Sequence, residues 1–292
     1  MKMNIRFVAF LSAVMAVSAA FAGDGSFRVV SWNVGHHAMG LHRNPSIPPG
    51  MGEKYLGMYR EFIGDARIVG VCEYSAAFST NEPIRTAETL YGKYDVKIEG
   101  TQRGAQCNSI FIRDCKLIES REREYPKRSQ KVYYQFARVL MDGREVCVVQ
   151  THLDWDLGKK DTLPRREWRA DQMRTIVADM AGEKYVIVAG DFNIMRHPSD
   201  TADHASEYDV FAEAGYTLAN KGQFVTWPAW SDPKRECPID NIMTKGFEMS
   251  DVQVKGHDKL SDHKMISCRL KFAEEFRGNL EGTDPVKAPP FR

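Results

Sequence analysis

The stretch Val186-Ile187-Val188-Ala189-Gly190-Asp191-Phe192-Asn193 joins an apolar run directly to an acid and an amide. A short, continuous apolar run of this kind is typical of a strand that is buried on both faces. Asp191 and Asn193 follow the run at once. We therefore expect a buried strand whose C-terminal end presents a carboxylate and an amide.

Five other places in the chain repeat this arrangement, in which an apolar run meets an acid, an amide or a histidine. They are Asn33 after 29–32, Glu73 after 68–72, His152 and Asp154 after 146–151, Asp240 after 238–239, and Asp262-His263 after 260–261. One polar residue at a strand end usually only begins a loop. Six such ends in one chain predict a functional site, because strand ends are rigid and can hold a set of side chains in place.

The remaining pattern predicts one α/β domain in which strands dominate. We expect strands at 27–32, 67–72, 94–99, 108–113, 116–120, 133–141, 144–150, 185–189, 239–243, 249–254 and 264–272, and helices at 54–63, 81–90, 164–180 and 207–214. Asp142-Gly143 between two of the strands is a strong signal for a type I′ hairpin. Sheets that pack face to face, with helices outside, would bury these strands.

Composition places the chain among globular proteins and limits its partners. Of the 292 residues, 43% are hydrophobic and 27% are charged, close to the averages of globular domains. Lys and Arg number 40 against 39 Asp and Glu, for a net charge of +1. This balance excludes a histone-like basic coat on nucleic acid, but a nuclease with a local basic strip stays open.

The N-terminal 22 residues read as a secretory signal peptide. Lys2 and Arg6 form a short positively charged region, and an apolar stretch follows from Phe7 to Ala20. Ala20-Phe21-Ala22 fits the small-x-small rule for signal peptide cleavage. An uncleaved anchor is the alternative, although the apolar run is shorter than the roughly 20 residues of a membrane span. We expect a secreted or periplasmic monomer without stable membrane insertion, with a domain at 23–277 and a loose tail at 278–292.

Export would permit disulfides among the six cysteines. The sequence allows one disulfide without indicating which pair forms it. It contains neither CxxC nor HExxH, so a zinc site is not indicated.

Carboxylates, amides and histidines at the strand ends indicate a particular chemistry. Carboxylate and amide oxygens are hard ligands that suit Mg²⁺, and Mn²⁺ and Ca²⁺ fit the same donors. A divalent ion beside two histidines and an Asp-x-Asn sequence is suited to phosphate ester hydrolysis. The absence of a Walker loop, GxGxxG and GxSxG disfavours a kinase, a dinucleotide oxidoreductase and an α/β-hydrolase.

Six motifs together resemble the endonuclease/exonuclease/phosphatase superfamily in order and spacing. They are SWN at 31–33, Glu73, THLD at 151–154, GDFN at 190–193, IDNI at 239–242 and SDH at 261–263. The superfamily includes DNase I, abasic-site endonucleases, inositol polyphosphate 5-phosphatases, neutral sphingomyelinases and deadenylases. The resemblance runs from Phe27 to about Leu270. It implies a four-layer α/β sandwich, with two central, mostly antiparallel sheets flanked by helices, and a divalent-metal phosphoesterase without a covalent intermediate.

The same resemblance implies a metal site of three residues. Glu73 matches the main carboxylate ligand of Mg²⁺, and Asn33 and Asp262 complete the metal environment. Asn33 has a structural alternative, in which its side chain only fixes the loop after the first strand.

It also implies five catalytic residues. Asp191 orients or deprotonates the attacking water, and Asn193 donates to the scissile phosphate. His263 is the essential histidine, which Asp240 holds in its tautomer, and His152 contacts the phosphate or helps the leaving group. Structural alternatives are a capping role for Asp240 and a satisfied core position for His152.

One segment departs from the DNase I-like pattern. These members carry a Glu partner for the first histidine, whereas the corresponding segment here reads Arg103-Gly104-Ala105-Gln106-Cys107-Asn108. The lack of a Glu puts in doubt a DNase I-type acid role for His152. The strand that begins at Asn108 is closer to that of sphingomyelinase-like members.

Two basic segments favour a nucleic-acid substrate. Segments 121–131 and 155–169 carry five positive charges each, and the second also contains Trp155 and Trp168. Basic groups with aromatic partners suit a polyanion, although a solvated hairpin tip and helix face would look the same. We expect an exported nuclease. The alternatives are a phospholipase C or sphingomyelinase-type esterase, an inositol phosphate phosphatase and, against the complete site, a catalytically inactive binding module.

Overall fold

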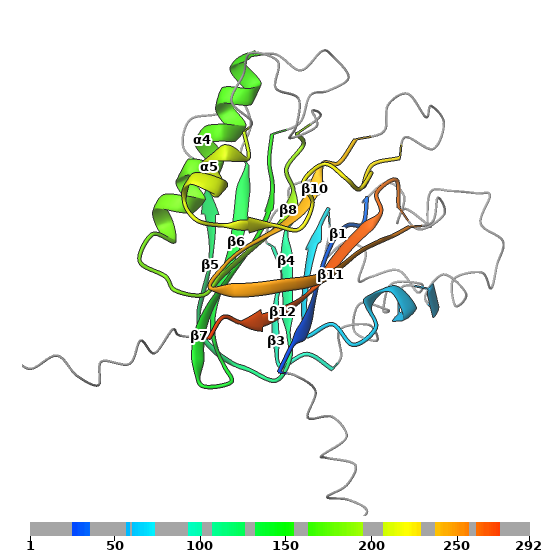
Figure 1. The fold of residues 1–292 in the computed structure, drawn as a ribbon, viewed down its shortest axis with the longest axis vertical. Coiled ribbons are helices and arrows are strands. Elements are labelled where there is room, and N and C mark those ends of the chain that lie inside the picture. The colour runs from blue at the N-terminus through cyan, green and yellow to red at the C-terminus, as the bar shows by residue number, and fades with distance from the viewer. Residues whose placement is uncertain are drawn as a thin grey trace, which may run out of the picture.

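Two six-stranded sheets face each other in the computed structural model, which describes residues 25–35, 57–58, 60–73, 93–100, 107–125, 132–154, 163–194, 207–228, 237–256 and 261–274 (Figure 1). The first sheet has the order β11 (Phe247–Lys255), β12 (Met265–Phe272), β1 (Phe27–Asn33), β2 (Ile68–Cys72), β4 (Ser109–Ile112), β3 (Val96–Ile98). The second has the order β5 (Lys116–Glu124), β6 (Tyr133–Met141), β7 (Arg144–His152), β8 (Val186–Asp191), β10 (Asp240–Lys245), β9 (Thr217–Leu218). The predicted signal peptide, the helix at 81–90 and the tail at 278–292 lie outside the described residues.

The main core lies between the sheets, because side chains alternate along each strand and every second one points inward. Val29 and Ile68 of the first sheet meet Val148 and Ile187 of the second in this cluster, and each of these four is at most 2% exposed. Branched and apolar residues at these positions therefore join the two sheets into one unit.

Helices cover both outer faces. Met173 and Ile176 of α4 (Leu163–Asp179) and Phe211 of α5 (Asp209–Glu213) pack against the second sheet. A short helix within 57–63 brings Ile63 against Trp32 on the outer face of the first sheet. Figure 1 shows these helices on opposite sides of the sheets. The predicted four-layer α/β sandwich is confirmed.

Each sheet contains one parallel pair of strands among antiparallel neighbours. In the first sheet β1 runs parallel to β2, with Asn33 opposite Cys72. In the second sheet β7 runs parallel to β8, with His152 opposite Asp191. Polar side chains that follow parallel strands gather at one edge of a sheet. Four of the predicted site residues are placed by this arrangement.

Most predicted strands occur close to their expected bounds, and two differences concern the second sheet. β5 continues to Glu124, so Arg121 and Arg123 lie on a strand rather than in a loop. The short strand β9 was not predicted. Asp142 and Gly143 have φ values of 51° and 75°, which confirms the type I′ turn between β6 and β7.

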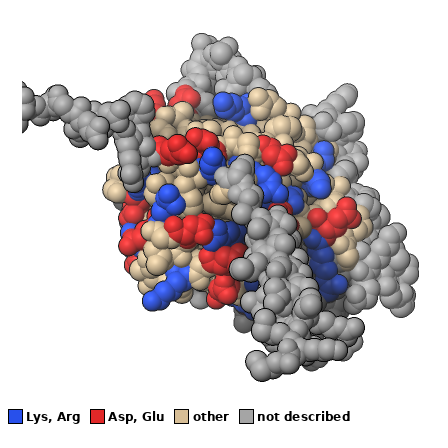
Figure 2. Space-filling view, turned by 60° about the horizontal axis from the view of Figure 1, so that its bottom comes forward, with Lys and Arg blue, Asp and Glu red and all other residues tan. Residues whose placement is uncertain are grey.

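The cysteines, the apolar character of the helices and the surface charges are the remaining features of the fold. All six cysteines are free thiols, so the disulfide that the sequence allowed is absent. None of the helices in the described ranges is long and apolar enough to span a membrane. Figure 2 shows a face on which acidic and basic side chains are interspersed rather than separated.

Candidate active site

Asp191, the last residue of β8, is the centre of the candidate site. Its Oδ2 accepts a hydrogen bond from Asn33 Nδ2 at 3.0 Å and lies 3.4 Å from His152 Nε2 and 3.7 Å from His263 Nε2. Its Oδ1 accepts the backbone N–H of Asn193 at 2.9 Å. The side chain is 1% exposed, so this carboxylate is held from four directions.

Asn33 connects the two sheets at the site. Its Nδ2 donates both to Asp191 and to Glu73 Oε1, the latter at 3.1 Å. Its Oδ1 accepts the N–H of Gly35 at 2.9 Å. The amide thus fixes the separation of two carboxylates, and its own oxygen is used within the β1 turn.

The two histidines take different partners. His263 Nδ1 lies 2.8 Å from Asp240 Oδ2, so the other ring nitrogen, Nε2, faces Asp191. His152 Nδ1 lies 4.0 Å from Glu73 Oε1, and its Nε2 faces Asp191. Both imidazole rings therefore point one nitrogen at the same carboxylate oxygen.

Backbone geometry at the end of β8 makes this approach possible. Gly190 has φ 149°, and a Cβ there would lie 1.9 Å from the carbonyl oxygen of Thr151. Only glycine allows β8 to approach β7 closely enough to place Asp191 beside His152. Asn193 and Glu73 adopt positive φ values of 51° and 58°, a conformation that asparagine tolerates and glutamate rarely adopts.

Residues outside the catalytic set anchor it. Ser261 Oγ donates to the carbonyl of Asn33 at 2.7 Å and accepts the N–H of His263 at 3.0 Å, which ties β1 to the SDH motif. Thr226 Oγ1 accepts the N–H of Asp240 at 2.9 Å. No local sequence pattern marks Thr226, because its partner lies 14 residues away.

A second anchor holds the THLD motif. Gln172 of α4 donates from Nε2 to Asp154 Oδ2 at 3.0 Å and accepts the Asp154 N–H at 3.2 Å. Asn193 Nδ2 donates to the carbonyl of Leu153, the neighbouring residue, at 2.9 Å. α4 therefore positions Leu153 and Asp154, and the Leu153 carbonyl in turn holds the side chain of Asn193. No pattern in the sequence indicated Gln172.

Burial and charge perturb the two central groups. Burial raises the pKa of Asp191 and Asp240 raises it further, against the opposing effect of His152, His263 and Asn33. Burial alone would lower the pKa of His263, but the carboxylates of Asp240 and Asp191 outweigh it and raise that pKa to about 10. Such perturbed groups in contact are typical of catalytic sites.

The donors present fit a hard divalent cation. Asp191, Asp240 and His263 offer ligating atoms within 4.8 Å of one another. Asp240 Oδ1 is buried and has no hydrogen-bond partner within the described part of the chain. The closest pair in this group, however, is the hydrogen bond between His263 and Asp240, which an ion between them would break. Glu73, whose side chain is 16% exposed, is therefore a better metal ligand than Asp240 or His263.

The structure brings together Asn33, Glu73, His152, Asp191, Asn193, Asp240 and His263. Asp262 stands apart from this cluster because its side chain is exposed beside His263. It lies near enough to raise the pKa of that histidine. Its predicted role in the metal environment stays a prediction.

Three arginines of the two basic segments have partners within the fold. Arg123 pairs with Asp179 of α4, and the Arg121 guanidinium lies 4.5 Å from the centre of the Phe136 ring. Arg169 is fully buried and pairs with Glu207 at 2.8 Å. Arg169 is therefore withdrawn from the surface, whereas Arg121 and Arg123 stay exposed on β5 beside their partners.

Residues 138–263 match the Endonuclease/Exonuclease/phosphatase family. A sequence comparison with curated proteins finds no significant match.

Three solved structures illustrate the shared fold. An endonuclease/exonuclease/phosphatase from Bacteroides vulgatus is 16% identical, with a TM-score of 0.64 over 85% of this chain and 99% of that one. D. rerio TDP2, crystallised with a single-strand DNA product, is 17% identical, with a TM-score of 0.62 over 85% and 100%. The human Nocturnin catalytic domain with bound sulfate is 19% identical, with a TM-score of 0.60 over 85% and 95%.

At these identities the structural likenesses establish the fold, and the family match covers the segment with four of the six motifs. Residues 138–263 are therefore similar to the endonuclease/exonuclease/phosphatase family, and the chain shares the fold of the three solved structures.

Proposed function

We propose that the protein is a divalent-metal-dependent phosphodiesterase that hydrolyses nucleic acid by direct attack of water, without a covalent intermediate. The observation that carries the proposal is the convergence on Asp191, whose Oδ2 meets one amide nitrogen and two imidazole nitrogens. A buried carboxylate with a raised pKa can accept a proton. The seven residues that the structure brings together around Asp191 include no serine or cysteine that could act as a nucleophile.

The residues divide the work by position. Asp191 orients the attacking water and takes its proton. His263 Nε2 and His152 Nε2 stand where negative charge develops on the phosphoryl oxygens, and they stabilise that charge. Asp240 holds His263 by its Nδ1, so that Nε2 points to the side of the site where Asp191 lies. Asn193 fixes the Asp191 carboxylate through its backbone N–H, and its side-chain amide donates to the carbonyl of Leu153.

Glu73 would hold the cation, with Asn33 setting its distance from Asp191. When bound, the ion supplies positive charge that offsets the charge of the transition state. Mg²⁺, Mn²⁺ and Ca²⁺ all suit these oxygen donors.

Nucleic acid is the preferred substrate because the superfamily is one of phosphoesterases and a structural relative, TDP2, was crystallised with a single-strand DNA product. The N-terminal pattern supports export to the periplasm or the medium, where such an enzyme would act as a monomer. Sphingomyelin-type and inositol phosphate esters are the competing substrates.

The test is hydrolysis by the mature chain, residues 23–292, of plasmid DNA, single-stranded DNA, RNA, sphingomyelin and inositol phosphates, with and without Mg²⁺. His263→Ala is the inactive variant, and Lys97→Ala, at an exposed position on β3, is the matched surface control. Mg²⁺-dependent cleavage of nucleic acid by the wild type and the control, but not by His263→Ala, is the expected result. If the protein hydrolyses sphingomyelin and leaves nucleic acid intact, the proposed substrate is wrong and the proposed phosphoesterase chemistry is retained.

A further inference from the structure

The loop at 220–226 lies beside Asp240, at an edge of β10 that β9 covers only in part. β9 pairs with two residues near the C-terminal end of β10 and does not reach Asp240. There the loop takes over: Thr226 Oγ1 accepts the Asp240 N–H at 2.9 Å, and Asn220 Nδ2 donates to the Asp240 carbonyl at 3.3 Å. Side chains of the loop therefore hold both backbone polar groups of Asp240, as a neighbouring strand would.

Asn220 gives this loop its shape. Its Oδ1 accepts the N–H groups of Gly222 at 3.0 Å and of Phe224 at 3.2 Å, and its Nδ2 also donates to the Phe224 carbonyl at 2.9 Å. An asparagine side chain that bonds to the backbone of the following residues stabilises a turn. Asn220 is 1% exposed, so solvent does not compete for these bonds.

A second buried amide fastens Asn220 to β10. The Asn220 N–H donates to Asn241 Oδ1 at 2.9 Å, and Asn241 Nδ2 donates back to the Asn220 carbonyl at 2.8 Å. Asn241 is fully buried and directly follows Asp240. This reciprocal pair fixes Asn220 relative to the strand that carries Asp240.

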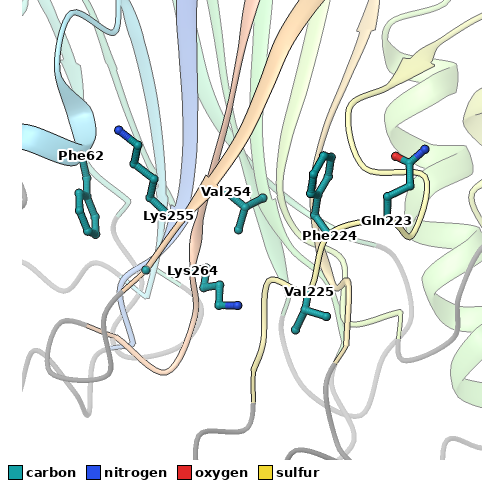
Figure 3. A pocket seen from close by; sticks show the side chains of 8 residues that line it. Phe62, Gln223, Phe224, Val225, Val254, Lys255 and Lys264 are labelled. Carbon is teal, nitrogen blue, oxygen red and sulfur yellow. The ribbon is translucent and has the colours of Figure 1, made fainter.

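The same loop also reaches the segment that carries His263. The backbone N–H of Lys264, the next residue, donates to the Thr226 carbonyl at 2.6 Å. Figure 3 shows Val225 on the loop with the Lys264 side chain beside it. Thr226 is therefore bonded both to Asp240 and to the residue after His263, and the side chains of Asp240 and His263 meet at 2.8 Å.

We propose that Asn220 is a positioning residue for catalysis, which holds the loop in the shape that lets Thr226 fix the Asp240–His263 pair. The inference rests on the proposed function, because it takes the roles of Asp240 and His263 from there. It adds a residue that none of the six motifs contains and that lies 20 positions before Asp240. Asn220 acts through the pair, so its loss changes the chemical step rather than substrate binding.

The test is the hydrolysis of bis-p-nitrophenyl phosphate with Mg²⁺. Asn220→Ala removes the side-chain bonds to Gly222, Phe224 and Asp240. We expect kcat to fall about 10- to 100-fold, the effect of a slightly misplaced catalytic group, and KM to stay within about twofold of the wild-type value. Ile112→Ala is the control, because it removes a fully buried side chain from the other sheet and lowers stability without touching the loop. It should keep the wild-type kcat at a temperature at which circular dichroism shows both variants folded.

A double-variant cycle with Asp240→Asn separates positioning from general destabilisation. Residues that act as a unit have non-additive effects on the rate. In the Asp240→Asn background, Asn220→Ala should therefore lower kcat by less than about twofold. The same fold-loss in both backgrounds would overturn the positioning role.

Thr226→Val and Thr226→Ser test the same route even if Asn220→Ala does not fold. Valine keeps the shape of the side chain but cannot accept the Asp240 N–H, whereas serine keeps the hydroxyl. We expect Thr226→Val to lose kcat and Thr226→Ser to retain most of it.

Two results would contradict the inference alone. Equal kcat values for the two Thr226 variants, or a kcat for Asn220→Ala equal to that of Ile112→Ala, would overturn the positioning role and spare the proposed function. A wild type that hydrolyses neither the small diester nor any nucleic acid would overturn both.

Discussion

Asp191 Oδ2 meets an amide nitrogen and two imidazole nitrogens within 3.7 Å, and the other oxygen of this carboxylate is bound by a backbone N–H. A buried charge is stable only when such partners replace the lost water. The same partners leave the carboxylate in one orientation. At the scale of the residue, burial and pairing therefore fix the position and the orientation of the Asp191 carboxylate.

Asp240→Asn tests the orientation of His263. The amide keeps the size of the side chain but removes the charge that pairs with Nδ1 at 2.8 Å. We expect kcat for a generic phosphodiester to fall by about 10²–10⁴-fold, the usual worth of a positioned acid–base group. Circular dichroism should remain native. A variant that folds and retains full kcat would show that Asp240 only caps β10.

Glu73→Gln tests the metal ligand. Glutamine still accepts a hydrogen bond from Asn33 but carries no charge to attract a cation. Activity of the wild type should disappear with EDTA and return with Mg²⁺, and the variant should need at least about tenfold more Mg²⁺. Titration of activity against Mg²⁺ gives the comparison. An identical titration curve for the variant would place the ion elsewhere, with Asp191 and Asp240 as the next donors.

At the scale of the element, a layer of small and polar residues separates the apolar core from the site. Gln150 of β7 donates to Cys72 Sγ at 3.0 Å, and the thiol donates to the carbonyl of Thr151 at 3.0 Å. Gly70 makes room for this contact, since a Cβ there would lie 1.8 Å from Gln150 Oε1. The contact ties the end of β2, and hence Glu73, to the strand that carries His152.

Gly190→Ala tests the close approach of β7 and β8. The added methyl would overlap the Thr151 carbonyl at 1.9 Å, and φ 149° is strained for alanine. We expect a loss of more than about 3 kcal/mol in the free energy of unfolding, together with loss of activity. Gly182→Ala is the matched control, because no atom lies within 4 Å of its added Cβ. Equal urea midpoints for the two variants would contradict the steric argument.

At the scale of the whole molecule, two parallel strand pairs in facing sheets bring their C-terminal ends to one edge. The Asn33–Asp191 hydrogen bond joins residues 158 positions apart, and the Ser261–Asn33 bond joins residues 228 apart. The site therefore exists only when both sheets have formed and packed. We expect substrate hydrolysis to be lost in the same cooperative transition as the fold.

The ion pair of Arg169 and Glu207 fixes α4 to the segment before α5. Arg169→Met leaves the Glu207 carboxylate in a nearly buried position without its partner, and we expect a loss of about 3–5 kcal/mol. Arg169→Met/Glu207→Leu should recover most of it, because removing both charges removes the penalty. Urea unfolding of the two variants measures the difference. A double variant less stable than the single one would show that the pair itself stabilises the protein.

The sequence by itself determined the strands and the polar residues at their ends. Apolar periodicity and the Asp142-Gly143 turn are local, and β6 was predicted at its observed bounds. The motifs also indicated the residues now seen around Asp191, because each motif lies within a few positions of a strand end. The roles that the resemblance implies for these residues stay predictions.

Only the tertiary structure decided which groups meet. It placed Asn33 as a bridge between two carboxylates, buried Arg169 against Glu207, and left the cysteines unpaired. These outcomes depend on contacts between distant segments. A charge in the sequence does not state its partner, and burial is a property of the packed chain rather than of any residue alone.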